Sequence, residues 1–247
     1  MLQHLLSVVD AQTIEDVWEE HIKHMADFGF DRLLYGYTSS LTESSFGDPE
    51  DILILSNHEP DYVKSFMDDG LYFHAPMVRW AMQNVGSCSW RWIAENSDSL
   101  SPSEQSVVRF NRSWGVVAGY SISFRDSSAR AKGAIALTAR RGMSQDEADA
   151  VWAEHGDTIE LCNKLAHLKI SSLPHAAQTR MLTKRQREVL EWVGDGKTVQ
   201  DIALLLNLTP QTVEKHLRLA REALDVHTTA QAVLKATRNR QIFMLES

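Results

Sequence analysis

The stretch NLTPQTVEKHLRLAREAL (Asn207–Leu224) decides the fold of the C-terminal part of the chain. Its apolar residues recur at the spacing of one helix face, which predicts a helix packed on a core. These residues are Val213, Leu217, Ala220 and Leu224. The opposite face carries glutamine, lysine and arginine, which can contact base edges and phosphates. By itself the pattern fits a solvated helix in a small bundle equally well.

Threonine precedes each of four short segments between residues 182 and 247. Each is followed by a residue that suits a helix start, in the pairs Thr183 with Gln186, Thr198 with Asp201, Thr209 with Pro210 and Thr228 with Gln231. A threonine cap with an acid or amide three residues on, or with proline next, satisfies or removes the free amide groups of a helix start. Asn207 and Leu208 provide a tight turn between the second and third segments. Four short helices with this turn predict a helix-turn-helix domain.

Charge is distributed unevenly along the chain of 247 residues, whose net charge is −8. Residues 1–181 carry 15 basic and 25 acidic side chains, whereas residues 182–247 carry ten basic and eight acidic ones. The mildly basic C-terminal part therefore suits a polyanion, and with the caps, the turn and the helix face it predicts binding to double-stranded DNA. The predicted contact residues are Lys197, Thr198, Thr209, Gln211, Thr212, Glu214, Lys215, Arg218 and Arg221.

Glu214 is the acidic member of this set. It lies near the N-terminal end of its helix, where the helix dipole favours a carboxylate. Cytosine offers an amino group that can donate a hydrogen bond to a glutamate carboxylate. We therefore interpret Glu214 as a specificity residue rather than as evidence against DNA binding.

Upstream, helical and strand patterns alternate. Helices are predicted over 13–28, 59–69 and 73–83, from Ser101, and from Ser144 towards Lys169, with strands over 31–38, 52–56, 116–125 and 132–139. The predicted fold class is α+β, an N-terminal α/β/α sandwich around an antiparallel sheet followed by a small all-α four-helix helix-turn-helix domain. Periodicity lapses in SSLPHAAQTRM, so the predicted parts are a sensor domain over 1–170, a linker over 171–181 and a DNA-binding domain over 182–247.

Two motifs resemble sites but lack required residues. GDGKT (Gly194–Thr198) resembles the end of a phosphate-binding loop, yet Glu191 stands where that loop needs glycine. His21 and His24 are spaced to share a helix face and a metal ion, but no cysteine or carboxylate at matching spacing accompanies them. A solvated helix face is therefore expected there, with no metal site. Together with the absence of a catalytic constellation, this predicts a protein that is not an enzyme and has no cofactor.

The chain lacks the sequence patterns of membrane and secreted proteins. No apolar run approaches membrane-spanning length, and the start MLQHLLSVVD has no signal pattern. Two cysteines cannot build a disulfide framework. A cytoplasmic protein without a membrane partner is expected.

The C-terminal segment LTKRQREVLEWVGDGKTVQDIALLLNLTPQTVEKHLRLAREALDVHTTAQAV closely resembles the LuxR-type helix-turn-helix domain. The matching residues are Leu182-Thr183, Val189-Leu190, Gly196-Lys197-Thr198, Ile202-Ala203, Thr212-Val213, His216 and Ala230-Gln231-Ala232-Val233. Gln186 departs from the usual glutamate but can still close its capping box. The resemblance implies a homodimer with two recognition helices about one turn of DNA apart on a two-fold symmetric site. It also allows RNA polymerase as a partner.

The N-terminal part lacks the alternating order of a receiver domain. Instead, Asn57–Trp90 resembles the autoinducer-binding domain of acyl-homoserine-lactone receptors, with Pro76 and Trp90 at matching positions. RSWGVVAGYSISF resembles the family's later strand that contains a glycine. The resemblance implies a small diffusible signal as ligand, bound at positions His58, Tyr62, Phe66, Ala75, Trp90 and Thr138.

Three of these positions depart from the family. Tyr62 stands where a tryptophan donates to the lactone carbonyl, a role that a phenol can take, and Phe66 replaces the usual tyrosine. Ala75 stands where an aspartate accepts the ligand's amide N–H, and an unpaired buried N–H costs about 1–3 kcal/mol.

Ala75 leaves three alternatives open. The pocket binds a ligand without that amide, or it binds an acyl lactone through altered contacts. In the third, aromatic side chains fill the pocket, and the chain is a ligand-independent regulator or antagonist whose N-terminal domain serves only dimerisation.

Overall fold

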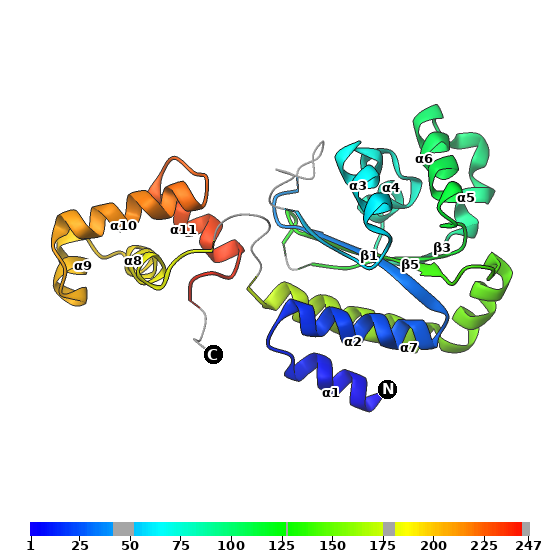
Figure 1. Ribbon diagram of the computed structural model, residues 1–247, viewed down its shortest axis with the longest axis horizontal. Helices are drawn as coiled ribbons and strands as arrows, with labels where there is room; N and C mark the ends of the chain where they lie inside the picture. The colour runs from blue at the N-terminus through cyan, green and yellow to red at the C-terminus, as the bar shows by residue number, and fades with distance from the viewer. Residues whose placement is uncertain (42–51, 127, 175–180, 244–247) are drawn as a thin grey trace. The chain divides into compact units, whose positions relative to one another are not determined.

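A computed structural model describes residues 1–41, 52–126, 128–174 and 181–243. The chain divides into two compact units, Met1–Ser171 and Ser172–Ser247 (Figure 1). The elements up to the end of the long helix are α1 (Leu2–Asp10), α2 (Ile14–Asp27), β1 (Phe30–Thr38), β2 (Leu53–Ser56), α3 (Pro60–Asp68), η2 (Leu71–His74), α4 (Pro76–Gln83), β3 (Gly86–Ser89), α5 (Arg91–Glu95), η3 (Ser97–Ser99), α6 (Pro102–Ser113), β4 (Gly119–Ser123), β5 (Lys132–Ala139) and α7 (Gln145–Ser172). They are followed by α8 (Lys184–Gly194), α9 (Val199–Leu206), α10 (Pro210–Ala223) and α11 (Thr229–Arg238).

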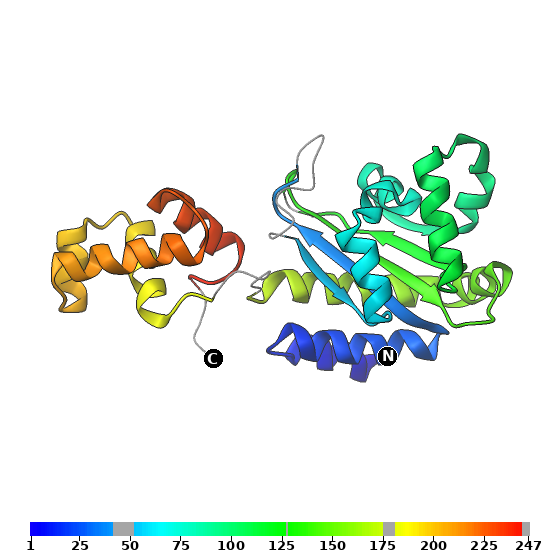
Figure 2. The ribbon, with the colours of Figure 1, turned by 45° about the horizontal axis from the view of Figure 1, so that its top comes forward.

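The first unit is built on a five-stranded sheet in the order β2-β1-β5-β4-β3. Every neighbouring pair is antiparallel, as predicted for this sheet. Helices α2 and α7 cover one face, helices α3 to α6 lie over the other, and α1 packs on the outside of α2 (Figures 1 and 2). With both faces covered, all five residues of β4 are buried. The predicted α/β/α sandwich is confirmed.

Three predicted helix starts, at Thr13, Ser101 and Ser144, are confirmed at atomic detail. The Thr13 side chain accepts from the Asp16 amide at the start of α2, and Ser101 closes a capping box at the start of α6. At the start of α7, the Ser144 amide donates to the Glu147 carboxylate, and the Glu147 amide donates to the Ser144 hydroxyl. Each cap satisfies amide groups that the helix itself leaves unpaired.

The single helix predicted over 73–83 is wrong. The chain forms the short 3-10 helix η2, passes through Ala75 in an extended conformation (φ −77°, ψ 123°), and starts α4 at Pro76. A proline disfavours the helical region for the residue before it, so Ala75 has to leave the helix. This break makes Ala75 the N-cap of α4, without a side-chain hydrogen bond.

Four of the described elements have no counterpart in the sequence predictions: α1, β3, α5 and η3. Strand β3 has the sequence GSCS, which has little strand propensity, and it exists because it pairs with β4. Helix α1 lies against α2 (Figure 1), and His21 of α2 is fully buried, with its ring near His4 of α1 and its Nε2 3.0 Å from Asn163 Oδ1 of α7. The expectation of a solvated face at His21 is therefore wrong.

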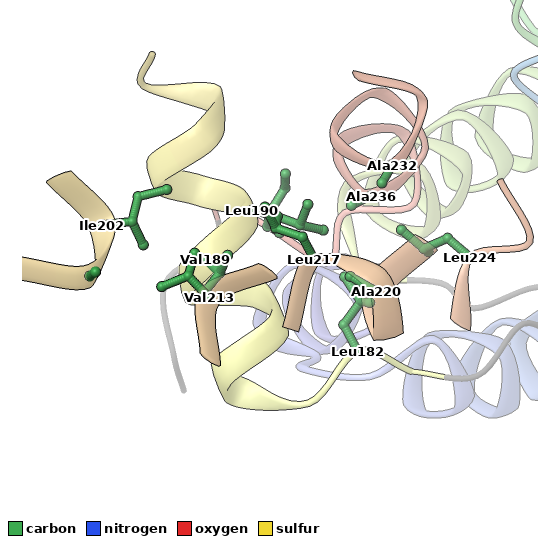
Figure 3. Packing of buried hydrophobic residues seen from close by; sticks show 12 residues of the cluster. Leu182, Val189, Leu190, Ile202, Val213, Leu217, Ala220, Leu224, Ala232 and Ala236 are labelled. Atoms are coloured by element: carbon green, nitrogen blue, oxygen red, sulfur yellow. The ribbon is translucent and has the colours of Figure 1, made fainter. Parts of the chain in front are cut away.

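The second unit contains the four predicted helices around one apolar core (Figure 3). The four residues that were predicted to form the buried face of the third helix are all inside this core, namely Val213, Leu217, Ala220 and Leu224. All four threonine caps form. The predicted four-helix helix-turn-helix fold is confirmed.

Each helix of this unit ends in the same way, with one residue in the left-handed conformation. These residues are Gly196, Asn207, Asp225 and Arg240. After α8, the Lys197 amide donates to the Trp192 carbonyl at 3.0 Å and the Gly196 amide to the Val193 carbonyl at 2.9 Å. This is the Schellman geometry. The glycines of GDGKT therefore end a helix, as predicted, and do not form a phosphate loop.

The predicted linker, 171–181, overlaps the end of α7, which continues to Ser172. Residues 175–180 of that segment lie outside the described part of the chain. Across the residues that the structure describes, no helix is both long and apolar enough to span a bilayer.

A glycine is required at the start of β4. Gly119 has φ +155°, and a Cβ added there would lie 2.1 Å from the Leu137 carbonyl oxygen. Gly142, with φ +88°, has open space around it. The two positions therefore separate backbone strain from a steric collision.

We expect Gly142→Ala to lower the free energy of unfolding by about 1–2 kcal/mol, the strain of the left-handed region. Gly119→Ala should lower it by roughly 1–3 kcal/mol more, because it also forces β4 away from β5. Urea titration followed by tryptophan fluorescence measures both, since six of the seven tryptophans lie in residues 1–171. Equal losses of unfolding free energy in the two variants would contradict a steric collision between a Cβ at position 119 and the Leu137 carbonyl oxygen.

Candidate functional site

The first unit contains a cavity of about 650 Å³ lined by strands β1 and β5 and by helices α3, α4 and α6. This volume lies within the usual range of small-molecule sites, roughly 300–1,000 Å³. Although they are spread over 81 residues of sequence, all six predicted ligand positions line it, namely His58, Tyr62, Phe66, Ala75, Trp90 and Thr138.

Tyr62 stands at the centre of an aromatic wall. Its ring stacks on His58 at 4.7 Å between centroids, on Phe66 at 5.6 Å and on Phe110 at 5.4 Å, and Trp114 meets it edge-on at 6.0 Å. These rings pack against one another and still leave the cavity open. The alternative in which aromatic side chains fill the pocket does not describe this structure.

Two potential donors to a ligand are already hydrogen-bonded within the protein. The Tyr62 hydroxyl donates to Asn111 Oδ1 at 3.1 Å, and Trp90 Nε1 donates to Ser121 Oγ at 3.0 Å. Burial raises the pKa of Tyr62 well above its ordinary value, so the phenol stays protonated. A ligand that uses either donor must share or replace these partners.

Asn111 and Ser121 line the cavity, although the sequence analysis did not identify them. A signal for Asn111 was present in the sequence. It lies four residues after the buried Val107, on the apolar face of α6, where an amide is out of place unless it has a partner. The sequence contained no such signal for Ser121. Every residue of β4 is buried, so the strand has no exposed face from which a buried serine could be distinguished.

His58 contributes an unpaired ring nitrogen. Its Nε2 lies 3.3 Å from Thr138 Oγ1, 80 residues further along the chain, whereas its buried Nδ1 has no hydrogen-bond partner. Burial, assisted by the positive charge of Arg32, lowers the pKa of His58 to about 4. The imidazole is therefore neutral near pH 7 and can either donate to or accept from a ligand.

The charged lining of the cavity is entirely cationic within the described residues. Arg109, Arg112 and Lys132 contribute to it, and no aspartate or glutamate does. Ala75 is 5% exposed and has no polar side-chain atom. The site therefore offers donors and positive charge, but no carboxylate that could accept an amide N–H.

In the second unit, helix α10 presents four of the nine predicted DNA contacts to solvent. Gln211, Glu214, Lys215 and Arg218 are exposed, and so are Lys197 and Thr198 at the start of α9. Arg218 pairs with Glu222 at 2.5 Å, one turn further along the same exposed face. An exposed pair of this kind contributes little to stability, so Arg218 can exchange it for a nucleic-acid contact.

Four of the predicted DNA contacts, Thr198 among them, have structural partners. The hydroxyls of Thr198 and Thr209 cap α9 and α10, and Thr212 Oγ1 lies 2.9 Å from that of Thr209. Arg221 is half-buried and donates to Thr229 Oγ1 of α11 at 2.8 Å. These four residues therefore position α9, α10 and α11 whether or not they also contact DNA.

Comparison with known proteins matches both units. The family described as the autoinducer binding domain matches residues 13–170, and the family described as "Bacterial regulatory proteins, luxR family" matches residues 180–236. The chain belongs to the LuxR family of autoinducer-binding transcriptional regulators. This LuxR-family regulator therefore combines a domain for a small-molecule signal with a DNA-binding domain.

Individual relatives are distant but extend along the chain. The transcriptional activator protein AnoR of Acinetobacter nosocomialis is 25% identical over 236 residues, covering 95% of both chains. The transcriptional activator protein LuxR of Aliivibrio fischeri is 23% identical over 188 residues, covering 75% of this chain and 73% of its own. The crystal structure of Escherichia coli SdiA has a TM-score of 0.55 at 17% identity and covers 98% of both chains. The curated relatives are named as regulators of transcription and not as enzymes.

The buried state of His58 predicts a loss of stability in acid. The folded protein keeps His58 neutral down to about pH 4, whereas an unfolded chain protonates it below its ordinary pKa of 6.5. The unfolded state therefore binds more protons between these pH values, and stability falls as the pH falls through that window.

We expect His58→Gln to reduce this acid loss, by up to about 3 kcal/mol between pH 7 and pH 4. Urea titrations at a series of pH values give the slope for each variant. His74→Gln, at an exposed position, is the matched control and should keep the wild-type slope. An unchanged slope in His58→Gln would show that His58 is protonated in the folded protein.

Proposed function

We propose that the cavity binds a small amphipathic signal molecule and that the chain acts as a homodimer on a two-fold symmetric operator. The observation that carries the first part is the convergence of His58, Tyr62, Phe66, Ala75, Trp90 and Thr138 on one open cavity. Within the proposal, these six residues are the ligand-binding residues, and Asn111 and Ser121 support them.

The lining indicates the chemistry of the ligand. Apolar side chains from several elements, among them Leu34, Met67, Val78 and Leu100, suit an acyl or alkyl chain. Tyr62, Trp90 and the three cationic residues suit a head group that accepts hydrogen bonds. With Ala75 in place of a carboxylate, an amide N–H on the ligand stays unpaired at that point. The cavity therefore favours the first of the three alternatives, a ligand without that amide.

Octanoyl-rac-glycerol is a suitable probe of this chemistry. It is the molecule in a SdiA complex, whose structure matches this chain at 16% identity with a TM-score of 0.55. It has an acyl chain, an ester and hydroxyl groups, and no amide N–H. N-octanoyl-homoserine lactone has a chain of the same length and carries the amide, so the pair isolates the contribution of that group.

We expect octanoyl-glycerol to raise the melting temperature of the wild-type protein more than the lactone does. Ala75→Asp should strengthen lactone binding by roughly tenfold to a hundredfold, the equivalent of one restored buried hydrogen bond. Thermal shift at a series of ligand concentrations measures both effects. Because aspartate also caps α4, each variant is compared with its own ligand-free state, and Ala75→Ser controls for the cap.

The alternative outcomes are distinct. A lactone shift that is equal in Ala75→Ser and Ala75→Asp would show that the carboxylate is irrelevant to ligand binding. No shift with either compound, and no stoichiometric small molecule in a solvent extract of protein purified from its native host, would favour the ligand-independent regulator. In that case the first unit would serve only dimerisation.

The DNA part of the proposal rests on α10. Gln211 and Glu214 lie at the end of the helix that can enter the major groove, and Lys215 and Arg218 follow on the same exposed face. One such helix reads one half-site, so a two-fold operator needs two copies of the chain. Contact with RNA polymerase, and action in the cytoplasm where bacterial DNA lies, belong to the same proposal.

We expect Arg218→Ala to weaken operator binding roughly tenfold to a hundredfold, the usual effect of losing a base contact. Gel-shift titration on a duplex selected from a random-sequence library measures the affinity, and circular dichroism checks the fold. Arg185→Ala is the matched control, because Arg185 also loses one exposed pair, with Glu188, but lies on α8. Unchanged affinity in Arg218→Ala, or an equal loss in Arg185→Ala, would contradict the proposal that α10 contacts the operator.

A further inference from the structure

Three metal-binding side chains meet on the face of the sheet away from the cavity. His4 of α1, His24 of α2 and Cys162 of α7 bring one ligand atom each to within 4.8 Å of one another. The helices that carry them lie side by side (Figures 1 and 2). None of the three residues lines the cavity. His4 and Cys162 are buried, and His24 is half-buried.

The histidines in this place lack the hydrogen bonds that buried polar atoms normally have. Nε2 of His4, Nε2 of His24 and Nδ1 of His21 are buried without a partner. The rings of His4 and His24 stack with centroids 4.1 Å apart, and His21 lies 5.7 Å from His4. Nearly all buried polar atoms in proteins have a hydrogen-bond partner, so three without one in the same place require an explanation.

The hydrogen bonds of Asn163 decide the tautomer of His21. The Asn163 amide nitrogen donates to the Ile159 carbonyl at 2.8 Å, which leaves Oδ1 to accept from His21 Nε2 at 3.0 Å. The proton of His21 is therefore on Nε2, and Nδ1 carries a free lone pair.

We propose that His4, His24 and Cys162 form a binding site for a transition-metal ion such as zinc. Two imidazoles and a thiolate are a donor set that zinc prefers. Tetrahedral ligand atoms lie roughly 3.3–3.8 Å apart, as zinc bond lengths require, so the three side chains close up by about 1 Å when the ion enters. Cys162 releases its thiol proton to solvent as the sulfur–zinc bond forms, and a water molecule takes the fourth position.

Asp27 supports the assignment of the ligand atom on His24. Its carboxylate Oδ2 lies 3.7 Å from His24 Nδ1. A carboxylate beside the distal ring nitrogen of a histidine ligand orients the ring and leaves Nε2 for the metal. This Nε2 is the same atom that has no protein partner.

The site contains one ligand from each of three helices. A bound ion therefore fastens α1 to α2 and to α7, in addition to the contact of Lys169 Nζ with the Val9 carbonyl at 2.7 Å. Its expected effect is structural stabilisation of the first unit, because binding to the folded state alone raises stability.

The test uses the full chain, stripped of metal by a chelator and then titrated with Zn²⁺ or Co²⁺ alone. We expect one equivalent to bind and to raise the melting temperature. Co²⁺ should produce tetrahedral visible bands and a thiolate charge-transfer band. Cys162→Ser should lose the charge-transfer band and bind at least about tenfold more weakly, whereas the matched variant Cys88→Ser should behave as wild type.

Cys162 is fully buried, so Cys162→Ser can weaken metal binding by disturbing the fold. A second pair of variants tests the site at a less buried position. His24→Gln, at a half-buried position, should also weaken Zn²⁺ binding at least about tenfold, with His74→Gln as its matched control. Circular dichroism of the metal-free proteins checks the fold. The proposal is overturned if the wild-type protein binds no equivalent of either ion, or if Cys162→Ser and His24→Gln bind them as tightly as the wild type does.

Discussion

The first unit depends on the need to cover both faces of one antiparallel sheet, and the two faces are covered differently. Helix α7 lies along one face, where its residues Ile159, Ala166 and Ile170 are almost fully buried. On the other face, short helices broken by turns leave a cavity above β1 and β5. A long regular helix can pack a sheet continuously, whereas short helices at several angles cannot fill the space as closely. The signal domain owes its cavity to this difference.

The break at Ala75 connects the local chain to the chemistry of the cavity. Pro76 forces Ala75 out of the helix and places it, buried, at the edge of the cavity. An aspartate in this position would cap α4 and could also accept a hydrogen bond from the amide N–H of a ligand. Alanine does neither. One residue therefore affects the stability of a helix start and, under the proposed function, the class of molecule that the cavity favours.

The second unit follows mainly from interactions within a few residues. Thr183, Thr198, Thr209 and Thr228 cap their own helices, and each helix ends at a residue in the left-handed conformation. Since these signals act over three to five residues, they are legible in the sequence. The exposed face of α10 could be predicted for the same reason, because helical periodicity alone separates it from the core.

The sequence alone determined the fold class, the starts of α2, α6, α7 and the four helices of the second unit, and the exposed face of α10. Through the family resemblance it also gave six positions that meet at one cavity. Tertiary structure decided what depends on residues distant in the chain. It paired Tyr62 with Asn111 and His58 with Thr138, and it formed β3 against β4. It also brought His4 and Cys162 to His24, which in the sequence had only His21 beside it. Caps and periodicity are local, whereas these contacts exist only after the sheet has placed its helices, so no short stretch of sequence encodes them.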